Sequence, residues 1–253
     1  MNRKAILLFD MDGTLTEPRK VITSKMHTFL REIRQNAPIA LVGGSDLPKI
    51  IEQMNGTFEQ VSSSFDYLFS ENGLVGFRGG QPTKRETIIS KLGEASLQRF
   101  ISHCLRYIAD LQLPAKRGTF VEFRKGMLNV SPVGRSCSQE ERMEFVKYDT
   151  ANNVRIKMIE NLQQHFPTNE FGLKYSIGGQ ISIDCFPVGW DKSYCLQFLQ
   201  EDGFNEIHFF GDKTSPGGND YEVFSDERTI GHTVTSTEDT MQQVQQVLAD
   251  WKK

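Results

Sequence analysis

Two aspartates two positions apart, Asp10 and Asp12, have the residue type and spacing for phosphoryl transfer. One carboxylate could act as a nucleophile while its neighbour acts as a general acid or base. A carboxylate attacks a phosphate poorly unless a cation screens both negative charges, and magnesium held by carboxylates does this. The pair alone also fits an Asp–Gly turn with a solvated aspartate beside it, because Asp and Gly are common turn formers.

The residues around this pair predict how it is held. The short apolar run 6–9 precedes Asp10 directly and is typical of a buried strand. Gly13 follows and permits a sharp turn. The two carboxylates would therefore stand at the carboxyl end of a strand, which is where open α/β sheets bind their ligands.

A similar arrangement recurs after residues 38–42, which predict a second buried strand ending in Gly43-Gly44-Ser45-Asp46. Ser45 would lie at the N-terminus of the next helix, where free N–H groups favour an anion. Ser45 could equally be an ordinary helix cap.

Asp212 follows a third predicted strand, 206–210, and with Asp10 it could complete a magnesium site. Asn219 and Asp220 lie close enough in sequence to support the metal or its waters. Lys192 stands at a predicted helix start next to Asp191, where a surface ion pair of little energetic value is the alternative interpretation.

The string DMDGT resembles the first motif of the haloacid dehalogenase (HAD) superfamily of phosphotransferases. In that superfamily the first aspartate takes up the phosphoryl group and the second is the general acid/base, which implies these roles for Asp10 and Asp12. The resemblance also implies that Ser45 hydrogen-bonds the transferring group and that Lys192 balances its charge.

The 253 residues suffice for one large domain or two smaller ones. A Gly-rich, basic stretch from 76 to 84 with Pro82 predicts a domain boundary near residue 83. The following hundred residues have an α+β pattern, with a long amphipathic helix over 97–111 and short strands before and after two further helices. We therefore predict an α/β fold with a parallel sheet, a HAD-like Rossmannoid core formed by 1–83 and 188–253, and an inserted α+β cap formed by 84–187.

Composition excludes some classes of function. The net charge of −3 argues against a nucleic-acid partner bound by bulk charge. No apolar run approaches membrane-spanning length, so we expect no membrane partner. The four cysteines form no CxxC pair, which favours free thiols in a reducing compartment and a cytoplasmic protein.

The predicted cap carries three arginines within twenty residues, Arg124, Arg135 and Arg142. Guanidinium forks bind phosphate through two hydrogen bonds, although a solvated basic face would also explain them. Ser182 and Asp184 alternate with apolar residues and therefore share one face of a strand. They could bind sugar hydroxyls or simply line a wet sheet face.

Three longer segments, GTFVEFRKGMLNVSPVGRSCSQEER, SIGGQISIDCFPVGWDK and FFGDKTSPGGNDYEVF, closely resemble the eukaryotic phosphomannomutases. The resemblance covers essentially the whole chain and implies a magnesium-dependent enzyme that forms homodimers through its caps. The substrate ligands implied are Arg19, Arg124, Arg135, Arg142, Ser182 and Asp184. The metal ligands implied are Asp10, Asp12 through its backbone carbonyl, and Asp212, with a second cation site at Phe224, Asp226 and Thr229.

The activity implied is the interconversion of mannose 6-phosphate and mannose 1-phosphate, activated by a hexose 1,6-bisphosphate and supplying mannose 1-phosphate for GDP-mannose synthesis. Glucose phosphates could also be accepted, because the arginines would grip phosphate more than sugar. Two alternatives are a sugar-phosphate hydrolase built on the same core and a non-catalytic sugar-phosphate sensor. The sensor is disfavoured because it need not keep both Asp10 and Asp12.

Overall fold

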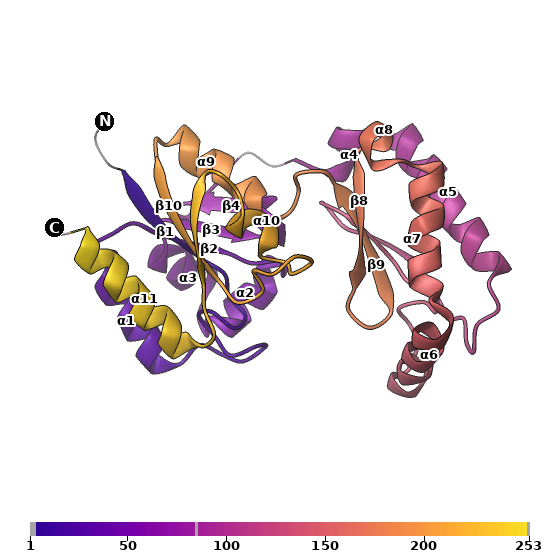
Figure 1. Ribbon diagram of the computed structural model, residues 1–253, viewed down its shortest axis with the longest axis horizontal. Coiled ribbons are helices and arrows are strands. Elements are labelled where there is room, and N and C mark those ends of the chain that lie inside the picture. Colours follow the sequence, from indigo (N-terminus) through magenta and orange to yellow (C-terminus); the bar gives the residue numbers. More distant parts are fainter. Residues whose placement is uncertain (1–3, 84–85, 252–253) are drawn as a thin grey trace. The chain divides into compact units, whose positions relative to one another are not determined.

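The computed structural model describes residues 4–83 and 86–251, which divide into two compact units (Figure 1). The first unit combines residues 1–85 and 189–253, and the second is formed by residues 86–188. The predicted cap began at Lys84, which lies outside the described residues.

The described part of the first unit is built on a seven-stranded sheet in the order β11-β10-β1-β2-β3-β4-β5. Five strands are parallel, which confirms the predicted α/β fold: β1 Ala5–Phe9, β2 Ile39–Val42, β3 Tyr67–Ser70, β10 Glu206–Gly211 and β11 Thr229–Thr233. Two antiparallel strands, β4 Val75–Arg78 and β5 Gln81–Pro82, extend one edge. Most of the Gly-rich stretch before the boundary predicted near residue 83 forms a hairpin, because Gly79 and Gly80 adopt the positive φ angles that a tight turn needs.

Helices cover both faces of this sheet. They are α1 Ser24–Arg34, α2 Leu47–Gln53, α3 Phe58–Ser64, α9 Leu196–Glu201, α10 Tyr221–Phe224 and α11 Thr237–Asp250, with short 3₁₀ turns η1 Glu71–Gly73 and η2 Lys192–Cys195. Alternate residues of β1 feed two separate cores. Leu7 and Phe9 pack with residues of α1 and α11, whereas Ile6 and Leu8 pack with residues of η2 and α9. A strand buried on both faces explains the unbroken apolar run before Asp10.

The N-cap of α2 differs from the prediction. The Asp46 side chain, not that of Ser45, accepts a hydrogen bond from the Lys49 backbone N–H at 3.3 Å. Aspartate caps helices as well as serine does, and here Asp46 rather than Ser45 occupies the N-cap position. Ser45 consequently lies just before the helix, between β2 and its cap.

The described part of the second unit has a four-stranded antiparallel sheet in the order β6-β7-β9-β8, formed by Val121–Phe123, Leu128–Val130, Ser182–Pro187 and Leu173–Gly178. Its helices, which Figure 1 shows to one side of the sheet, are α4 Ile88–Leu92, α5 Glu94–Asp110, α6 Gln139–Asn152, α7 Val154–His165 and α8 Thr168–Phe171. Ser138 and Glu141 form the capping box predicted for α6.

The register of the second sheet aligns polar residues across its strands. Glu122 of β6 lies opposite Asn129 of β7, which lies opposite Asp184 of β9. Directly opposed residues share a face, so these side chains form one row. The neighbouring positions Val130 and Ile183 are fully buried.

Every helix in the described ranges 4–83 and 86–251 is too short or too polar to cross a bilayer. All four cysteines are free thiols, three of them buried.

Candidate active site

Asp10 lies directly after β1, and its buried side chain accepts hydrogen bonds from Lys192 and, at 3.4 Å, from the Thr14 hydroxyl. The Lys192 ammonium donates a hydrogen bond to Asp10 Oδ1 and another, of 2.6 Å, to Asp220 Oδ1. Lys192 is 1% exposed and Asp220 is fully buried. Lys192 thus lies buried between two carboxylates, which excludes the surface-pair interpretation of Lys192.

Burial and the ammonium act in opposite directions on Asp10. The net pKa of Asp10 is raised to about 6, because burial raises it, the charge of Lys192 lowers it and the charge of Asp220 raises it. The two carboxylates raise the pKa of Lys192 well above its usual range, against the effect of desolvation. Lys192 therefore stays charged and supplies the positive charge that keeps a buried aspartate ionised.

Asp212, at the end of β10, completes an acidic cluster with Asp10 and Asp220. One oxygen atom of each lies within 4.8 Å of the others. Asp212 Oδ1 is buried and has no hydrogen-bond partner among the described residues, an arrangement that a cation would satisfy. Carboxylate oxygens are the donors that Mg²⁺ prefers. The residues present therefore fit a magnesium ion at Asp10 and Asp212.

Asp220 is itself a member of this cluster, although the sequence suggested only a supporting position, and both its carboxylate oxygens accept hydrogen bonds. Oδ1 accepts from Lys192, and Oδ2 accepts from the Lys213 backbone N–H at 3.0 Å. We therefore assign Asp220 the role of holding Lys192 in place. Asn219 is exposed on the loop before it.

Gly13 is required for the close approach of Asp212. A Cβ atom at this position would lie 2.4 Å from Asp212 Oδ2, and the residue has a φ of +86°. Only glycine combines this backbone angle with this proximity.

Asp12 is held by two donors. Its Oδ1 accepts from the Arg19 backbone N–H at 2.7 Å and from Gln53 Nε2 at 2.8 Å. Gln53 closes α2 and is 2% exposed. Sequence reasoning missed it, although a glutamine three residues after the buried Ile50 on an amphipathic helix was a usable signal. The backbone of Arg19 is bound here, while its side chain is exposed.

Ser45 follows β2, which pairs with β1. Its residue is half-buried, and its carbonyl accepts from the Glu71 backbone N–H at 2.9 Å. Ser45 thus lies at the same edge of the sheet as Asp10, as predicted for the carboxyl ends of neighbouring parallel strands.

The loop expected to bind a second cation is organised around Arg228. The Arg228 guanidinium donates to both carboxylate oxygens of Asp226, at 2.7 and 2.6 Å, and lowers the pKa of that carboxyl. The Thr229 hydroxyl donates to the Val223 carbonyl at 2.6 Å, and Phe224 ends α10. A cation bound through the Asp226 carboxylate would have to compete with Arg228, so this site stays a prediction.

In the second unit, two of the three predicted arginines meet. Arg124 and Arg135 both contact Glu122, and Arg135 also donates to Asn129 Oδ1 at 2.7 Å. Asn129 Nδ2 donates to Asp184 Oδ1 at 2.6 Å. Sequence reasoning missed Glu122 and Asn129, which join the predicted residues into one network.

The remaining predicted residues of this unit lie nearby in the chain but outside that network. Arg142 is half-buried in the first turns of α6. Ser182 is 3% exposed at the start of β9, and its carbonyl accepts from Arg155 at 3.2 Å.

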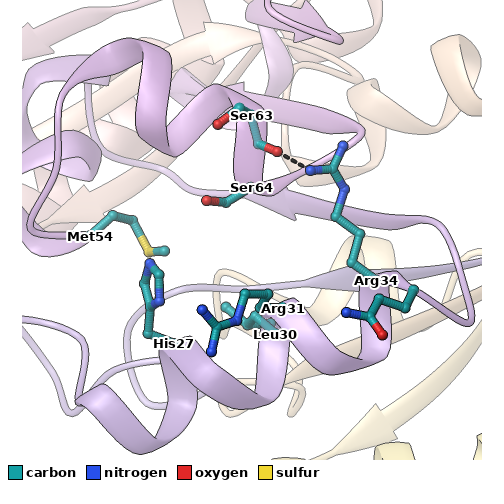
Figure 2. A pocket seen from close by; sticks show the side chains of 8 residues that line it. His27, Leu30, Arg31, Arg34, Met54, Ser63 and Ser64 are labelled. Carbon is teal, nitrogen blue, oxygen red and sulfur yellow. Dashed lines mark hydrogen bonds between the residues drawn. The ribbon is translucent and has the colours of Figure 1, made fainter.

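A pocket of about 370 Å³ lies elsewhere in the first unit, between α1 and the end of α3 (Figure 2). Its lining residues are His27, Leu30, Arg31, Arg34, Gln35, Met54, Ser63 and Ser64. Arg34 donates to the Ser63 carbonyl and pairs with Asp66 at 3.3 Å. No lining residue is a carboxylate, so this pocket does not match the acidic cluster that phosphoryl transfer requires.

The parallel sheet with paired carboxylates after β1, a buried lysine and a further aspartate after β10 defines a HAD-like protein. Solved structures with this fold include a haloacid dehalogenase-like hydrolase from Bacteroides thetaiotaomicron, with a TM-score of 0.59, 15% identity and coverage of 97% of this chain and 100% of that one. A trehalose-6-phosphate phosphatase from Aspergillus fumigatus has a TM-score of 0.57, 14% identity and coverage of 98% and 93%.

Sequence comparison resolves the family. A family model described as eukaryotic phosphomannomutase matches residues 26–250. A phosphomannomutase from Glycine max is 58% identical over 238 residues, covering 94% of each chain. A probable phosphomannomutase from Caenorhabditis elegans is 55% identical over 248 residues, covering 98% of this chain and 96% of the relative. The chain belongs to the eukaryotic phosphomannomutase family.

Proposed function

We propose that the protein is a magnesium-dependent phosphomannomutase that interconverts mannose 6-phosphate and mannose 1-phosphate. One observation carries the proposal: the chain has two separate sites suited to phosphate. The first unit holds the acidic cluster with Lys192, and the second holds the guanidinium pair Arg124 and Arg135. A mutase needs a site for the phosphate that is not being transferred, as well as a nucleophile for the one that is.

In this proposal Asp10 carries the phosphoryl group as a phosphoaspartate, formed from a hexose 1,6-bisphosphate. A substrate hydroxyl attacks the phosphorus, the bond to the Asp10 oxygen breaks, and Asp12 takes the hydroxyl proton. Gln53 and the Arg19 N–H both occupy Asp12 Oδ1, so Oδ2 exchanges the proton. Bound at Asp10 and Asp212, Mg²⁺ would offset the charge of the phosphoryl oxygens.

Lys192 and Ser45 act on the same group. Lys192 balances the negative charge of Asp10, which departs as a carboxylate when its bond to phosphorus breaks. Ser45 donates a hydrogen bond to the transferring phosphate. The bisphosphate then turns so that its other phosphate meets Asp10, while Arg124, Arg135 and Arg142 bind the end that has reacted and Ser182 and Asp184 bind sugar hydroxyls.

The rival function is a sugar-phosphate hydrolase, in which water attacks the phosphoaspartate. The two are separated by supplying mannose 1-phosphate with and without a hexose 1,6-bisphosphate and measuring both mannose 6-phosphate and inorganic phosphate. We expect the bisphosphate to activate the formation of mannose 6-phosphate. Release of inorganic phosphate at a rate equal to substrate loss would contradict the mutase and favour the hydrolase.

We further propose a cytoplasmic homodimer, paired through its second units, that supplies mannose 1-phosphate for GDP-mannose synthesis. The four free thiols support a reducing compartment. Leu105 on α5 is 44% exposed and is a candidate contact of the dimer. Sedimentation velocity of the full chain, compared with its Leu105→Glu variant, tests the pairing; a monomer in the unsubstituted chain would contradict it.

A further inference from the structure

The arginines assigned to substrate phosphate already have an anion between them. Arg124 donates from Nε and Nη2 to Glu122 Oε2, at 2.8 and 2.6 Å. Arg135 Nε lies 3.2 Å from the same oxygen. One carboxylate oxygen therefore occupies the N–H groups of two guanidinium ions, as a phosphate oxygen would.

The row of polar residues across this sheet and the two arginines that contact it have no net charge together. Glu122, Asn129 and Asp184 lie opposite one another across β6, β7 and β9. Two positive charges on Arg124 and Arg135 face two negative charges on Glu122 and Asp184, and Asn129 joins the halves through hydrogen bonds of 2.7 and 2.6 Å. Side chains in the Glu122–Arg124–Arg135 cluster are 34–39% exposed, so an incoming phosphate can reach them.

We infer that Glu122 is a positioning residue that competes with the substrate's phosphate for Arg124 and Arg135 and thereby limits how tightly they hold it. The inference rests on the proposed function. A bisphosphate that must turn end for end has to leave these guanidinium groups in every cycle. When phosphate departs, the Glu122 carboxylate restores their hydrogen bonds, so neither charged group is left without a partner.

A purely structural role for Glu122 predicts the opposite effect. If the carboxylate served only to aim the two guanidinium groups, then its removal would leave them mobile and weaken phosphate binding. The sign of the change in affinity therefore separates competition from scaffolding.

The test uses the full-length chain and its Glu122→Gln variant, with mannose 1-phosphate as the calorimetric probe and magnesium withheld to prevent turnover. We expect the dissociation constant to fall roughly three- to tenfold, because two half-exposed ion pairs are removed from the free state. An unchanged or raised dissociation constant would overturn the inference. Glu122→Asp, shorter by one methylene, keeps the charge and is expected to move affinity in the same direction by a smaller factor.

Glu141→Gln is the matched control, because Glu141 pairs with Arg117 in the same unit but outside the row. Glutamine also preserves its capping box with Ser138, so affinity should equal that of the unsubstituted chain. Equal tightening in both variants would overturn the inference, since it would reflect net charge alone.

Steady-state kinetics gives the second readout. In Glu122→Gln we expect KM and kcat to fall together, because tighter binding slows the turning of the bisphosphate. A raised KM at unchanged kcat would overturn the inference. If the unsubstituted chain shows no mutase activity at all, the proposed function fails, whereas the calorimetric comparison still decides whether Glu122 competes with phosphate.

Discussion

Lys192 controls the charge of the proposed nucleophile. It is 1% exposed and contacts Asp10 and Asp220, both of which are buried. Replacing it with methionine keeps the length of the side chain but leaves two buried carboxylates without their cation. Breaking such an ion pair destabilises a protein by about 3–5 kcal/mol. We expect Lys192→Met to lower the melting temperature measurably and to reduce kcat at least a hundredfold.

Lys213 offers a control for this substitution. Lys213 follows β10 with an exposed side chain, and only its backbone N–H contacts Asp220. Lys213→Met should leave the melting temperature nearly unchanged. A Lys192→Met protein as stable as Lys213→Met would show that the buried ion pairs of Lys192 contribute little to stability.

Gly13 has two reasons to be glycine, and they can be separated. Gly13→Ala would bring a Cβ to within 2.4 Å of Asp212 Oδ2 at a φ of +86°. Gly217 has nearly the same φ, +87°, but a Cβ added there would have no atom of the described residues within 4 Å. Both substitutions should cost about 1 kcal/mol of backbone strain, but only Gly13→Ala should displace Asp212.

The measurement is the magnesium concentration that gives half-maximal activity, together with the melting temperature. We expect the magnesium concentration for half-maximal activity to rise at least tenfold in Gly13→Ala and to stay unchanged in Gly217→Ala. An equal effect in the two variants would show that backbone strain, rather than displacement of Asp212, is responsible.

At the scale of the elements, the sequence predicted those helices and strands that depend on local hydrophobic and capping patterns. The apolar run before Asp10 predicted β1, and Ser138 with Glu141 predicted the start of α6. It missed β11, whose residues Thr229–Thr233 show no apolar run, because pairing with β10 rather than local composition makes this segment a strand. It also missed partners such as Gln53 and Glu122, because contacts across strands and helices are set by tertiary packing.

One buried arginine contacts both ends of the turn between β8 and β9. Arg155 pairs with Asp149 at 2.7 Å and donates to the carbonyls of Gly179 and Ser182 at 2.9 and 3.2 Å. Lysine keeps the charge but lacks the planar fork that makes these contacts together. We expect Arg155→Lys to raise the KM for mannose 1-phosphate severalfold with a smaller change in kcat, because Ser182 and Asp184 would be less well held.

Hydrogen exchange provides the structural readout for this variant. The amides of β9 should exchange faster in Arg155→Lys, whereas those of β1 should not change. Arg106→Lys, at an exposed position of α5, is the control for the same substitution. Unchanged exchange in β9 would show that the hairpin is held without Arg155.

At the scale of the whole molecule, the two compact units have separate hydrophobic cores, and the acidic cluster comes entirely from the first. A ligand stabilises only the folded part that binds it, by about 2.7 kcal/mol at a hundred times its dissociation constant. We therefore expect calorimetry of the full chain to show two unfolding transitions, and magnesium should raise the transition temperature of only one of them.

Asp212→Asn should abolish that shift, and Glu141→Gln in the second unit should preserve it. If magnesium moved both transitions together, the units would unfold as one cooperative body. If it moved neither, the orphaned oxygen of Asp212 would not belong to a metal site.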